Sequence, residues 1–206
     1  MNNQSPQELI STIISSSEAG TIFVASDFIH LANNSAIRKS LSRLSESGLI
    51  RRIIQGVYEY PMYSDFLGEY VSASPHKVAM AIASKNSWTI VPDGLTALNL
   101  LGLSSQVPAV WTYVSTGPYK NYVVGKNAIC FKRTASKDIS MLSYKSALIA
   151  QAIKAIGKGS INDANMKHIA RLLSDEDKAA ILVEGRNMTT WVYEILKSIC
   201  NGEMDS

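Results

Sequence analysis

Residues 33–60 read NNSAIRKSLSRLSESGLIRRIIQGVYEY, and this stretch decides the fold that we expect for the N-terminal part of the chain. Asn-Asn-Ser at 33–35 is a turn and helix-cap cluster, and Gly48 stands where helices commonly stop. The spacing between these points predicts an amphipathic helix with a narrow apolar stripe. The residues of that stripe are Ile37, Leu41 and Leu44.

The residues after this helix predict a β-hairpin. The runs 49–54 and 57–60 are rich in β-branched, aliphatic and aromatic residues, and Gln55-Gly56 lies between them. A glycine in a short turn favours close antiparallel pairing of the flanking strands. A hairpin directly after such a helix is typical of the wing of a DNA-binding domain.

Three shorter elements are expected before residue 33. Ser5-Pro6 precedes apolar residues at helical spacing, which predicts a capped helix. Residues 21–24 predict a short strand, and Ser26-Asp27 predicts the N-cap of a helix over 28–31 that is about two turns long. Residues 1–62 are therefore expected to form a winged helix-turn-helix.

Basic charge is concentrated in the predicted helix and hairpin. Residues 28–56 hold five basic residues and one acidic residue, although the whole chain has a formal net charge of only +3. We expect these cations to meet DNA phosphates, which supply much of the affinity of DNA-binding proteins. The residues expected to contact double-stranded DNA are Asn34, Ser35, Arg38, Lys39, Ser42, Arg43, Arg51, Arg52 and Gln55.

The outward face of the predicted helix suits a DNA major groove, because short hydroxyl side chains lie between long cations. That face carries Ser35, Lys39, Ser42 and Glu46, and Arg38 and Arg43 flank it. In the hairpin, alternation places Arg51 and Arg52 on opposite sides, so only one of them is expected to touch DNA. The alternative interpretation is that this unit docks another protein and its cations merely face solvent.

The rest of the chain predicts two further segments. Residues 63–140 mix helical and β-type runs, and we expect a small α+β domain with a mainly antiparallel sheet. Residues 141–206 return to helical periodicity and predict a helical C-terminal region. The expected strands are 110–115, 122–124 and 128–132, and the expected C-terminal helices are 142–156, 165–173 and 188–199. The fold class is therefore α+β, with domains 1–62, 63–140 and 141–206.

Composition excludes several classes of protein. Hydrophobic residues make up 46% and charged residues 18%, which is typical of a folded globular chain. Cys130 and Cys200 have no Cys or His at ligand spacing, which argues against a structural zinc and a disulfide framework and favours a cytoplasmic protein. No secretory signal, membrane span, metal or cofactor is expected.

Signals of catalysis are weak, so we expect a non-enzymatic protein. The sequence contains no phosphate-binding loop, dinucleotide fingerprint or nucleophile elbow. A nuclease could use Asp175, Glu176 and Lys178 around a divalent ion, but this acidic run follows Ser174 and is explained more simply by the first turn of a helix. The histidines, each expected in a surface or cap position, are His30, His76 and His168.

Two stretches carry a family resemblance. The first is 38–52, RKSLSRLSESGLIRR, with Gly56-Val57-Tyr58 and Tyr60-Pro61 behind it. The second is 92–108, PDGLTALNLLGLSSQVP, with Ser115-Thr116-Gly117-Pro118 behind it. Over about residues 26–132 the chain resembles the AbiEi-type antitoxins of abortive-infection, type IV toxin–antitoxin systems. The helical stretch after residue 140 does not match this pattern.

The resemblance implies an N-terminal winged helix that represses its own operon by binding an upstream operator, with Arg38, Arg43, Arg51 and Arg52 on the DNA-reading unit. It also implies a following domain that counteracts a nucleotidyltransferase toxin without a tight complex. We therefore expect a sequence-specific repressor and autoregulating antitoxin. Two alternatives stay open, a stand-alone regulator whose middle domain binds a ligand or protein, and the nucleic-acid enzyme described above. Residues 92–108 either lock a loop through side-chain hydrogen bonds to its backbone or form a partner surface.

Overall fold

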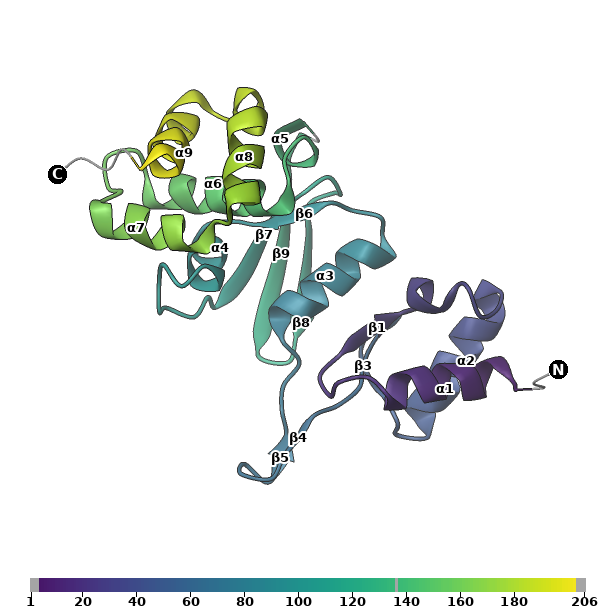
Figure 1. Ribbon diagram of the computed structural model, residues 1–206. Coiled ribbons are helices and arrows are strands. Elements are labelled where there is room, and N and C mark those ends of the chain that lie inside the picture. The colour runs from purple at the N-terminus through teal and green to yellow at the C-terminus, as the bar shows by residue number, and fades with distance from the viewer. Residues whose placement is uncertain (1–3, 136, 203–206) are drawn as a thin grey trace. The chain divides into compact units, whose positions relative to one another are not determined.

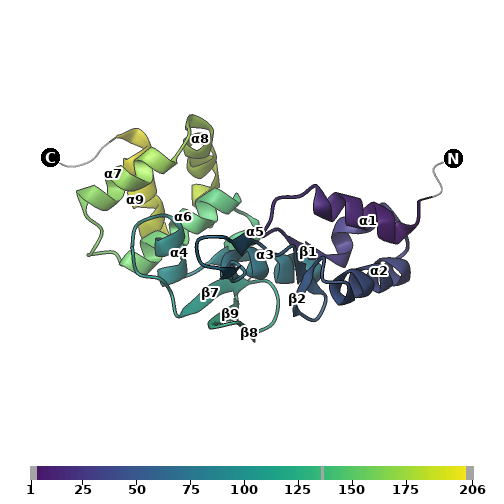
Figure 2. The same ribbon diagram turned by 90° about the horizontal axis from the view of Figure 1, so that it is seen from below.

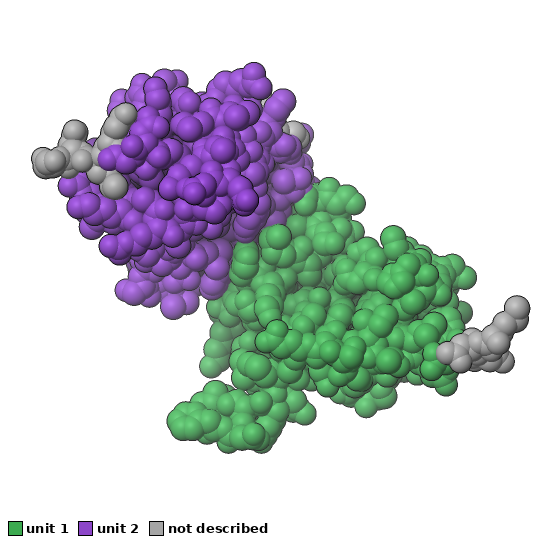
Figure 3. All heavy atoms as spheres, viewed as in Figure 1, with its two compact units in different colours: residues 1–88, 123–127 green, residues 89–122, 128–206 purple. Residues whose placement is uncertain are grey.

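The structure of the chain is a computed structural model that describes residues 4–135 and 137–202 (Figure 1). The chain forms two compact units, coloured separately in Figure 3. Unit 1 comprises residues 1–88 and 123–127, and unit 2 comprises residues 89–122 and 128–206. The predicted domain boundaries lie after residues 62 and 140. They do not coincide with the limits of these two units, and they stay predictions.

The elements of unit 1 begin at capping residues that the sequence already indicates. Their bounds are α1 (Pro6–Ser15), β1 (Ile22–Val24), the 3₁₀ helix η1 (Ala25–Phe28), α2 (Asn34–Glu46), β2 (Arg51–Ile54), β3 (Val57–Glu59), β4 (Tyr63–Ser64), β5 (Glu69–Tyr70) and α3 (Pro75–Lys85). At the start of α1, Ser5 and Glu8 form a reciprocal capping box. At the start of α2, the Asn33 side chain accepts a hydrogen bond from the Ala36 N–H at 2.9 Å.

Helices α1 and α2 pack against each other, and their apolar side chains share a core with a three-stranded sheet in the order β1-β3-β2. The predicted hairpin is confirmed, since β2 and β3 pair antiparallel, with Arg51 opposite Glu59 and Arg52 opposite Tyr58. The predicted apolar stripe of α2 is confirmed as well, and it faces the core of this unit. The buried residues of that core are Ile10, Ile14, Phe23, Phe28, Ile37, Leu41, Leu44, Ile50 and Tyr58.

The predicted helix over 28–31 is wrong. The chain instead forms η1 over Ala25–Phe28, and the following three residues are turns. The Asp27 carboxylate accepts a hydrogen bond from the Val24 N–H at 2.8 Å, and this bond closes a single tight turn. Phe28 is fully buried against Phe23, with ring centroids 5.6 Å apart. One buried anchor fixes a turn, whereas a longer helix needs a repeating apolar stripe.

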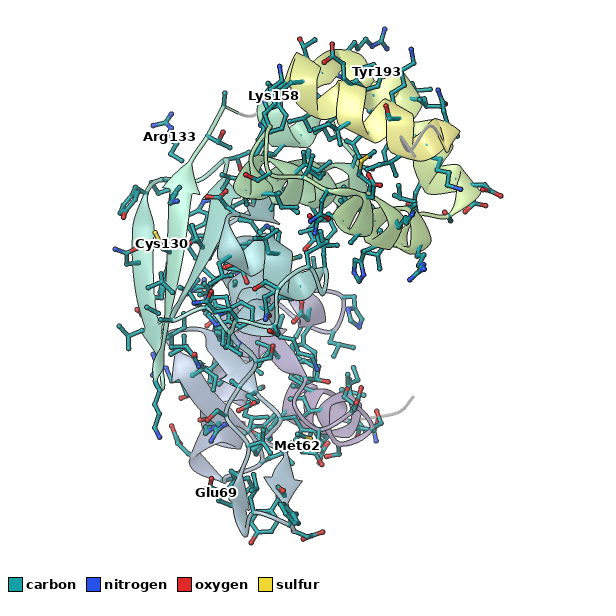
Figure 4. The ribbon with its side chains drawn as sticks, turned by 90° about the vertical axis from the view of Figure 1, so that its left-hand side faces the viewer. Met62, Glu69, Cys130, Arg133, Lys158 and Tyr193 are labelled. Atoms are coloured by element: carbon teal, nitrogen blue, oxygen red, sulfur yellow. The ribbon has the colours of Figure 1, made fainter. Side chains whose placement is uncertain are left out.

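Residues 63–70 form a short ribbon that the sequence does not predict. Strands β4 and β5 pair Tyr63 with Tyr70, whose ring centroids lie 5.3 Å apart. The ribbon extends from the rest of its unit (Figure 1), and Figure 4 labels Glu69 on it. Its turn exposes Phe66, with 96% of that side chain accessible. Strands of two residues are too short for the alternating pattern that reveals a strand in a sequence.

Unit 2 contains a four-stranded sheet in the order β6-β7-β9-β8. The strands are β6 (Ile90–Pro92), β7 (Val110–Ser115), β8 (Lys120–Val124) and β9 (Asn127–Arg133), and α4 (Leu95–Leu100) lies between the first two. The three predicted β-type runs are present, with bounds shifted by up to two residues. The sheet is mixed: β6 and β7 pair antiparallel, as expected, whereas β7 and β9 pair in parallel from Val110↔Ala128 to Ser115↔Arg133. The edge strand β8 reverses the chain between them.

The C-terminal part of unit 2 is helical, as predicted. Its elements are α5 (Lys137–Ser140), α6 (Tyr144–Ile156), α7 (Asp163–Leu172), α8 (Asp175–Glu184), the 3₁₀ helix η2 (Gly185–Asn187) and α9 (Thr190–Asn201). Helix α6 is central, because it packs against α4, β6, α8 and α9, and its residues 146–153 are all buried. None of the helices that the structure describes has the length and apolar character needed to cross a bilayer.

Side-chain hydrogen bonds hold the loop after α4. The Asn99 amide donates to the Gln106 carbonyl at 3.1 Å, and the Ser104 hydroxyl accepts from the Gln106 N–H at 3.2 Å. His168 contacts the same region through a 2.7 Å hydrogen bond between its Nε2 and the Leu101 carbonyl. These contacts support the loop-locking interpretation of residues 92–108.

Candidate nucleic-acid interface

A groove of about 580 Å³ lies between α2 and the β2–β3 hairpin, and we call it the α2–hairpin groove. Figure 2 shows α2 and β2 in the same part of unit 1. The polar residues that line the groove are Ser26, Asn34, Arg38, Ser42, Arg52, Gln55, Tyr58 and Lys85, and none of its lining residues is acidic. Five of the residues predicted to contact DNA are therefore brought together in one concave surface.

Helix α2 places its groove residues by simple periodicity. Asn34, Arg38 and Ser42 are four residues apart and therefore fall on one side of the helix. The apolar stripe lies next to this side and is anchored by Ile37 and Leu41, which are at most 1% exposed. Burial of this stripe fixes the rotation of the helix, and with it the direction of the polar side chains. Leu41 also forms part of the groove floor.

In α2 and the β2–β3 hairpin, four exposed cations have no hydrogen-bond or ion-pair partner among the described residues. They are Arg38, Lys39, Arg43 and Arg52, and we call them the free cation set. Three belong to α2 and the fourth to β2. Cations without a carboxylate partner keep their full charge for a ligand, and two of them, Arg38 and Arg52, line the α2–hairpin groove from different elements.

Arg51 is arranged differently from its neighbour. Its guanidinium donates from Nε and Nη2 to the Glu59 carboxylate at 3.1 and 2.5 Å, and from Nη2 to the Val71 carbonyl at 3.0 Å. Glu59 is only 2% exposed, so this is an ion pair with a buried acid. Arg51 therefore holds the hairpin in place, whereas Arg52 lines the groove. This division fits the expectation that only one of the two arginines is available to DNA.

Lys85, at the end of α3, is a groove residue that sequence reasoning missed. Its ammonium group donates to the carbonyl of Gln55 in the hairpin turn at 2.5 Å. The lysine adds a third cation to the groove lining and fixes the turn that carries Gln55. No local pattern could have indicated it, because Lys85 and Gln55 lie thirty residues apart.

The remaining predicted residues lie outside the main groove. Ser35 and Lys39 line a shallow depression at the start of α2 together with Asn34 and Arg38. Arg43 is exposed on α2. Ser42, which lines the main groove, donates from its hydroxyl to the Glu46 carboxylate at 3.1 Å. The outward face of α2 is thus as polar as the helical wheel predicts.

The acidic run in unit 2 has a structural role. Asp177 accepts a hydrogen bond from the Ser174 N–H at 2.9 Å, and this bond lowers the pKa of the Asp177 carboxyl. Asp175 pairs with Lys178 at 3.4 Å on the surface of the same helix turn. Among the described residues, no group of three or more potential metal ligands comes together. The run therefore forms the capped start of α8.

Comparison with known proteins gives one match. A family model described as "Family of unknown function (DUF6088)" matches residues 9–181, which include α2, the hairpin and most of unit 2. The search of curated proteins found no match, and the search of solved structures found none either.

Proposed function

Because the chain belongs to the DUF6088 family, whose description gives no activity, we propose a function from its own residues: it binds double-stranded DNA and regulates transcription. In this proposal α2 is the recognition helix of a winged helix-turn-helix, and the β2–β3 hairpin is the wing. The observation that carries it is the convergence of Arg38 and Arg52, from two elements, on one groove without acidic lining residues.

The chemistry of the free cation set supports contact with a duplex. DNA carries one negative charge per phosphate, and each neutralised phosphate releases condensed counterions. If all four cations meet phosphates, the logarithm of the binding constant should fall with the logarithm of salt concentration with a slope of about −3 to −4. Low bulk at Ser35 and Ser42 lets the helix backbone approach the groove floor of DNA closely.

We expect the side chains on the groove side of α2 to contact the DNA bases. Asn34 can pair with the N6 and N7 atoms of adenine, and Arg38 with the O6 and N7 atoms of guanine. Arg52 and Gln55 lie on the hairpin, where a wing contacts a phosphate strand or the minor groove. A regulator of this kind works in the cytoplasm, where the DNA is.

The test is a binding titration by fluorescence anisotropy with a duplex from the region upstream of the gene. We expect tighter binding to this duplex than to a scrambled one. An Arg38→Ala/Arg43→Ala double variant should weaken binding at least about 100-fold. A matched control, Lys158→Ala/Lys197→Ala, removes two exposed cations of unit 2 and should bind as the wild type does. Wild-type affinity in the Arg38/Arg43 double variant would disprove the assignment of α2.

A narrower proposal follows from the resemblance to AbiEi-type antitoxins. In that case the DNA bound is the operator of the chain's own operon, and the second activity is neutralisation of a nucleotidyltransferase toxin. The test is to express the gene immediately downstream, alone and together with this chain. Growth arrest that this chain relieves would support the antitoxin role. A harmless downstream gene would favour the stand-alone regulator instead.

A further inference from the structure

A second cavity lies in unit 2, separate from the α2–hairpin groove, and its lining residues are suited to binding a ligand. It has a volume of about 410 Å³ and lies between α6, η2 and the start of α9. Its apolar lining residues are Met141, Leu142, Ala147, Ala150, Met188 and Val192. Its polar lining residues are Gln151, Lys154, Arg186, Asn187 and Thr189, and none of the lining residues is acidic.

Gln151 is the residue that requires an explanation. It lies in the fully buried run 146–153 of α6, and only 9% of it is exposed. Its side-chain amide has no hydrogen-bond partner among the described residues, although it lines the cavity. Because this amide faces the cavity and has no protein partner there, it is available to hydrogen-bond a ligand. The other polar residue of this run, Ser146, is satisfied by Ser143 at 2.7 Å.

The other groups around Gln151 favour an anion. Lys154 and Arg186 are exposed cations without ion-pair partners among residues 4–135 and 139–202. Helix α9 begins at this cavity, and its N-cap Thr189 makes no side-chain capping bond. The first N–H groups of a helix and its dipole attract negative charge. The cavity lining therefore combines hydrogen-bond donors and positive charge with apolar side chains.

We propose that this cavity binds a small organic anion, in which a carboxylate or phosphate group is joined to a compact apolar group. The anionic group contacts Arg186, Lys154 and the start of α9, and the Gln151 amide hydrogen-bonds to the same group from the buried side. The apolar part packs against Ala147, Ala150 and Val192. This site does not depend on DNA binding.

The test is a titration of the ¹⁵N-labelled full-length chain, followed by NMR, with benzoate, phenyl phosphate and neutral benzamide. We expect saturable shifts of α6 and α9 amide signals with benzoate or phenyl phosphate, and which of the two binds more tightly identifies the anionic group. Benzamide should bind at least about 10-fold more weakly, because it cannot use the cations. Absence of saturation by both anions up to about 10 mM, or equal binding of benzamide, would overturn the proposal.

Two variants test whether Arg186 and Gln151 contribute to anion binding, and a third variant is the matched control. Arg186→Gln should raise the dissociation constant at least about 10-fold. Gln151→Leu should also weaken binding, because it removes the amide that faces the cavity. Lys158→Gln removes an exposed cation outside the cavity (Figure 4) and should leave anion binding unchanged. Unchanged anion binding in Arg186→Gln or in Gln151→Leu would contradict the assignment.

Discussion

The carboxylate of Glu59 is buried beneath the guanidinium of Arg51, which sits opposite it in the β2–β3 register and donates two hydrogen bonds to it. Only 2% of the Glu59 side chain is exposed, whereas 41% of Arg51 is. A buried carboxylate that loses its partner keeps its desolvation cost and loses the compensating attraction. The pair is therefore a structural element of the hairpin.

We expect Arg51→Gln to lower the free energy of unfolding by about 2–3 kcal/mol, at the lower end for breaking such a pair because Arg51 is partly solvated. Urea unfolding followed by circular dichroism measures this. The double variant Arg51→Gln/Glu59→Gln should recover part of the loss, since it removes the buried charge as well. A double variant as unstable as the sum of both single variants would show that the two side chains do not act as a pair.

Arg52→Gln should change DNA binding and leave the free energy of unfolding almost unchanged. Arg52 is exposed and has no partner among the described residues, so its loss should change the free energy of unfolding by less than about 0.5 kcal/mol. If Arg52 meets a phosphate, the slope of the logarithm of the DNA-binding constant against the logarithm of salt concentration should shrink by about one. Binding titrations over a range of salt concentrations give this slope. A slope equal to that of the wild type would remove Arg52 from the interface.

The sequence anticipates the elements whose signals are local. Helix α2 is predicted because its cap, its apolar stripe and the glycine after it all lie within sixteen residues, Asn33 to Gly48. The hairpin is predicted because its turn and both strands are contiguous. Alternation even separates Arg51 from Arg52, although it cannot say which one faces the groove. That is decided by the buried partner Glu59, which holds the guanidinium of Arg51.

Contacts between distant segments could not be predicted in this way. Lys85 reaches the hairpin turn only because α3 packs beside the β1–β3 part of the sheet. In unit 2, Gln151 looks like one polar residue in an apolar helix until the other residues that line its cavity are known. Periodicity indicates which side of a helix is buried, but it does not indicate what covers that side.

Gly56 is required by the backbone of the hairpin turn. Its φ angle is +74°, a conformation that an L-residue with a Cβ atom adopts at a cost of about 1–2 kcal/mol. A Cβ atom would also lie 3.1 Å from the Lys85 ammonium nitrogen. We expect Gly56→Ala to lower the free energy of unfolding by about 1–2 kcal/mol and Gly56→Asn by less, because Asn tolerates this conformation. Urea unfolding of both variants measures the two losses.

The matched control for Gly56 is Gly159→Ala. Gly159 has no positive φ, and a Cβ atom added there would meet no heavy atom within 4 Å beyond its chain neighbours. Its substitution should change the free energy of unfolding by less than about 0.5 kcal/mol. Equal losses at both glycines would argue against conformational strain in the hairpin turn.

His76 should make unit 1 sensitive to acid. The histidine lines a surface cavity with Asp27 and Lys77, and burial lowers its pKa below the ordinary value of 6.5. Protons therefore bind the unfolded chain more readily than the folded one between the two pKa values. Stability should be full above about pH 7 and fall as the pH drops through 6.5 towards the folded-state pKa.

Urea unfolding at pH 7.5 and 5.5 tests this prediction, with His76→Gln as the comparison. The variant should lose less stability than the wild type on acidification. Burial raises the pKa of Asp27, so its protonation contributes stability in the opposite direction on acidification, and Asp27→Asn separates the two effects. An identical pH dependence in His76→Gln and the wild type would show that the histidine does not contribute.

Gly185 is required for space rather than for backbone conformation. Its backbone is helical, yet a Cβ atom there would collide with the ring of Tyr193, whose hydroxyl donates to the Leu182 carbonyl at 3.3 Å. We expect Gly185→Ala to lower the free energy of unfolding by about 1–3 kcal/mol through overpacking. In a Tyr193→Ala background the same substitution should cost at least about 0.5 kcal/mol less, because the ring that it meets is gone. Strictly additive losses in this double-mutant cycle would place the origin of the Gly185 requirement elsewhere than at Tyr193.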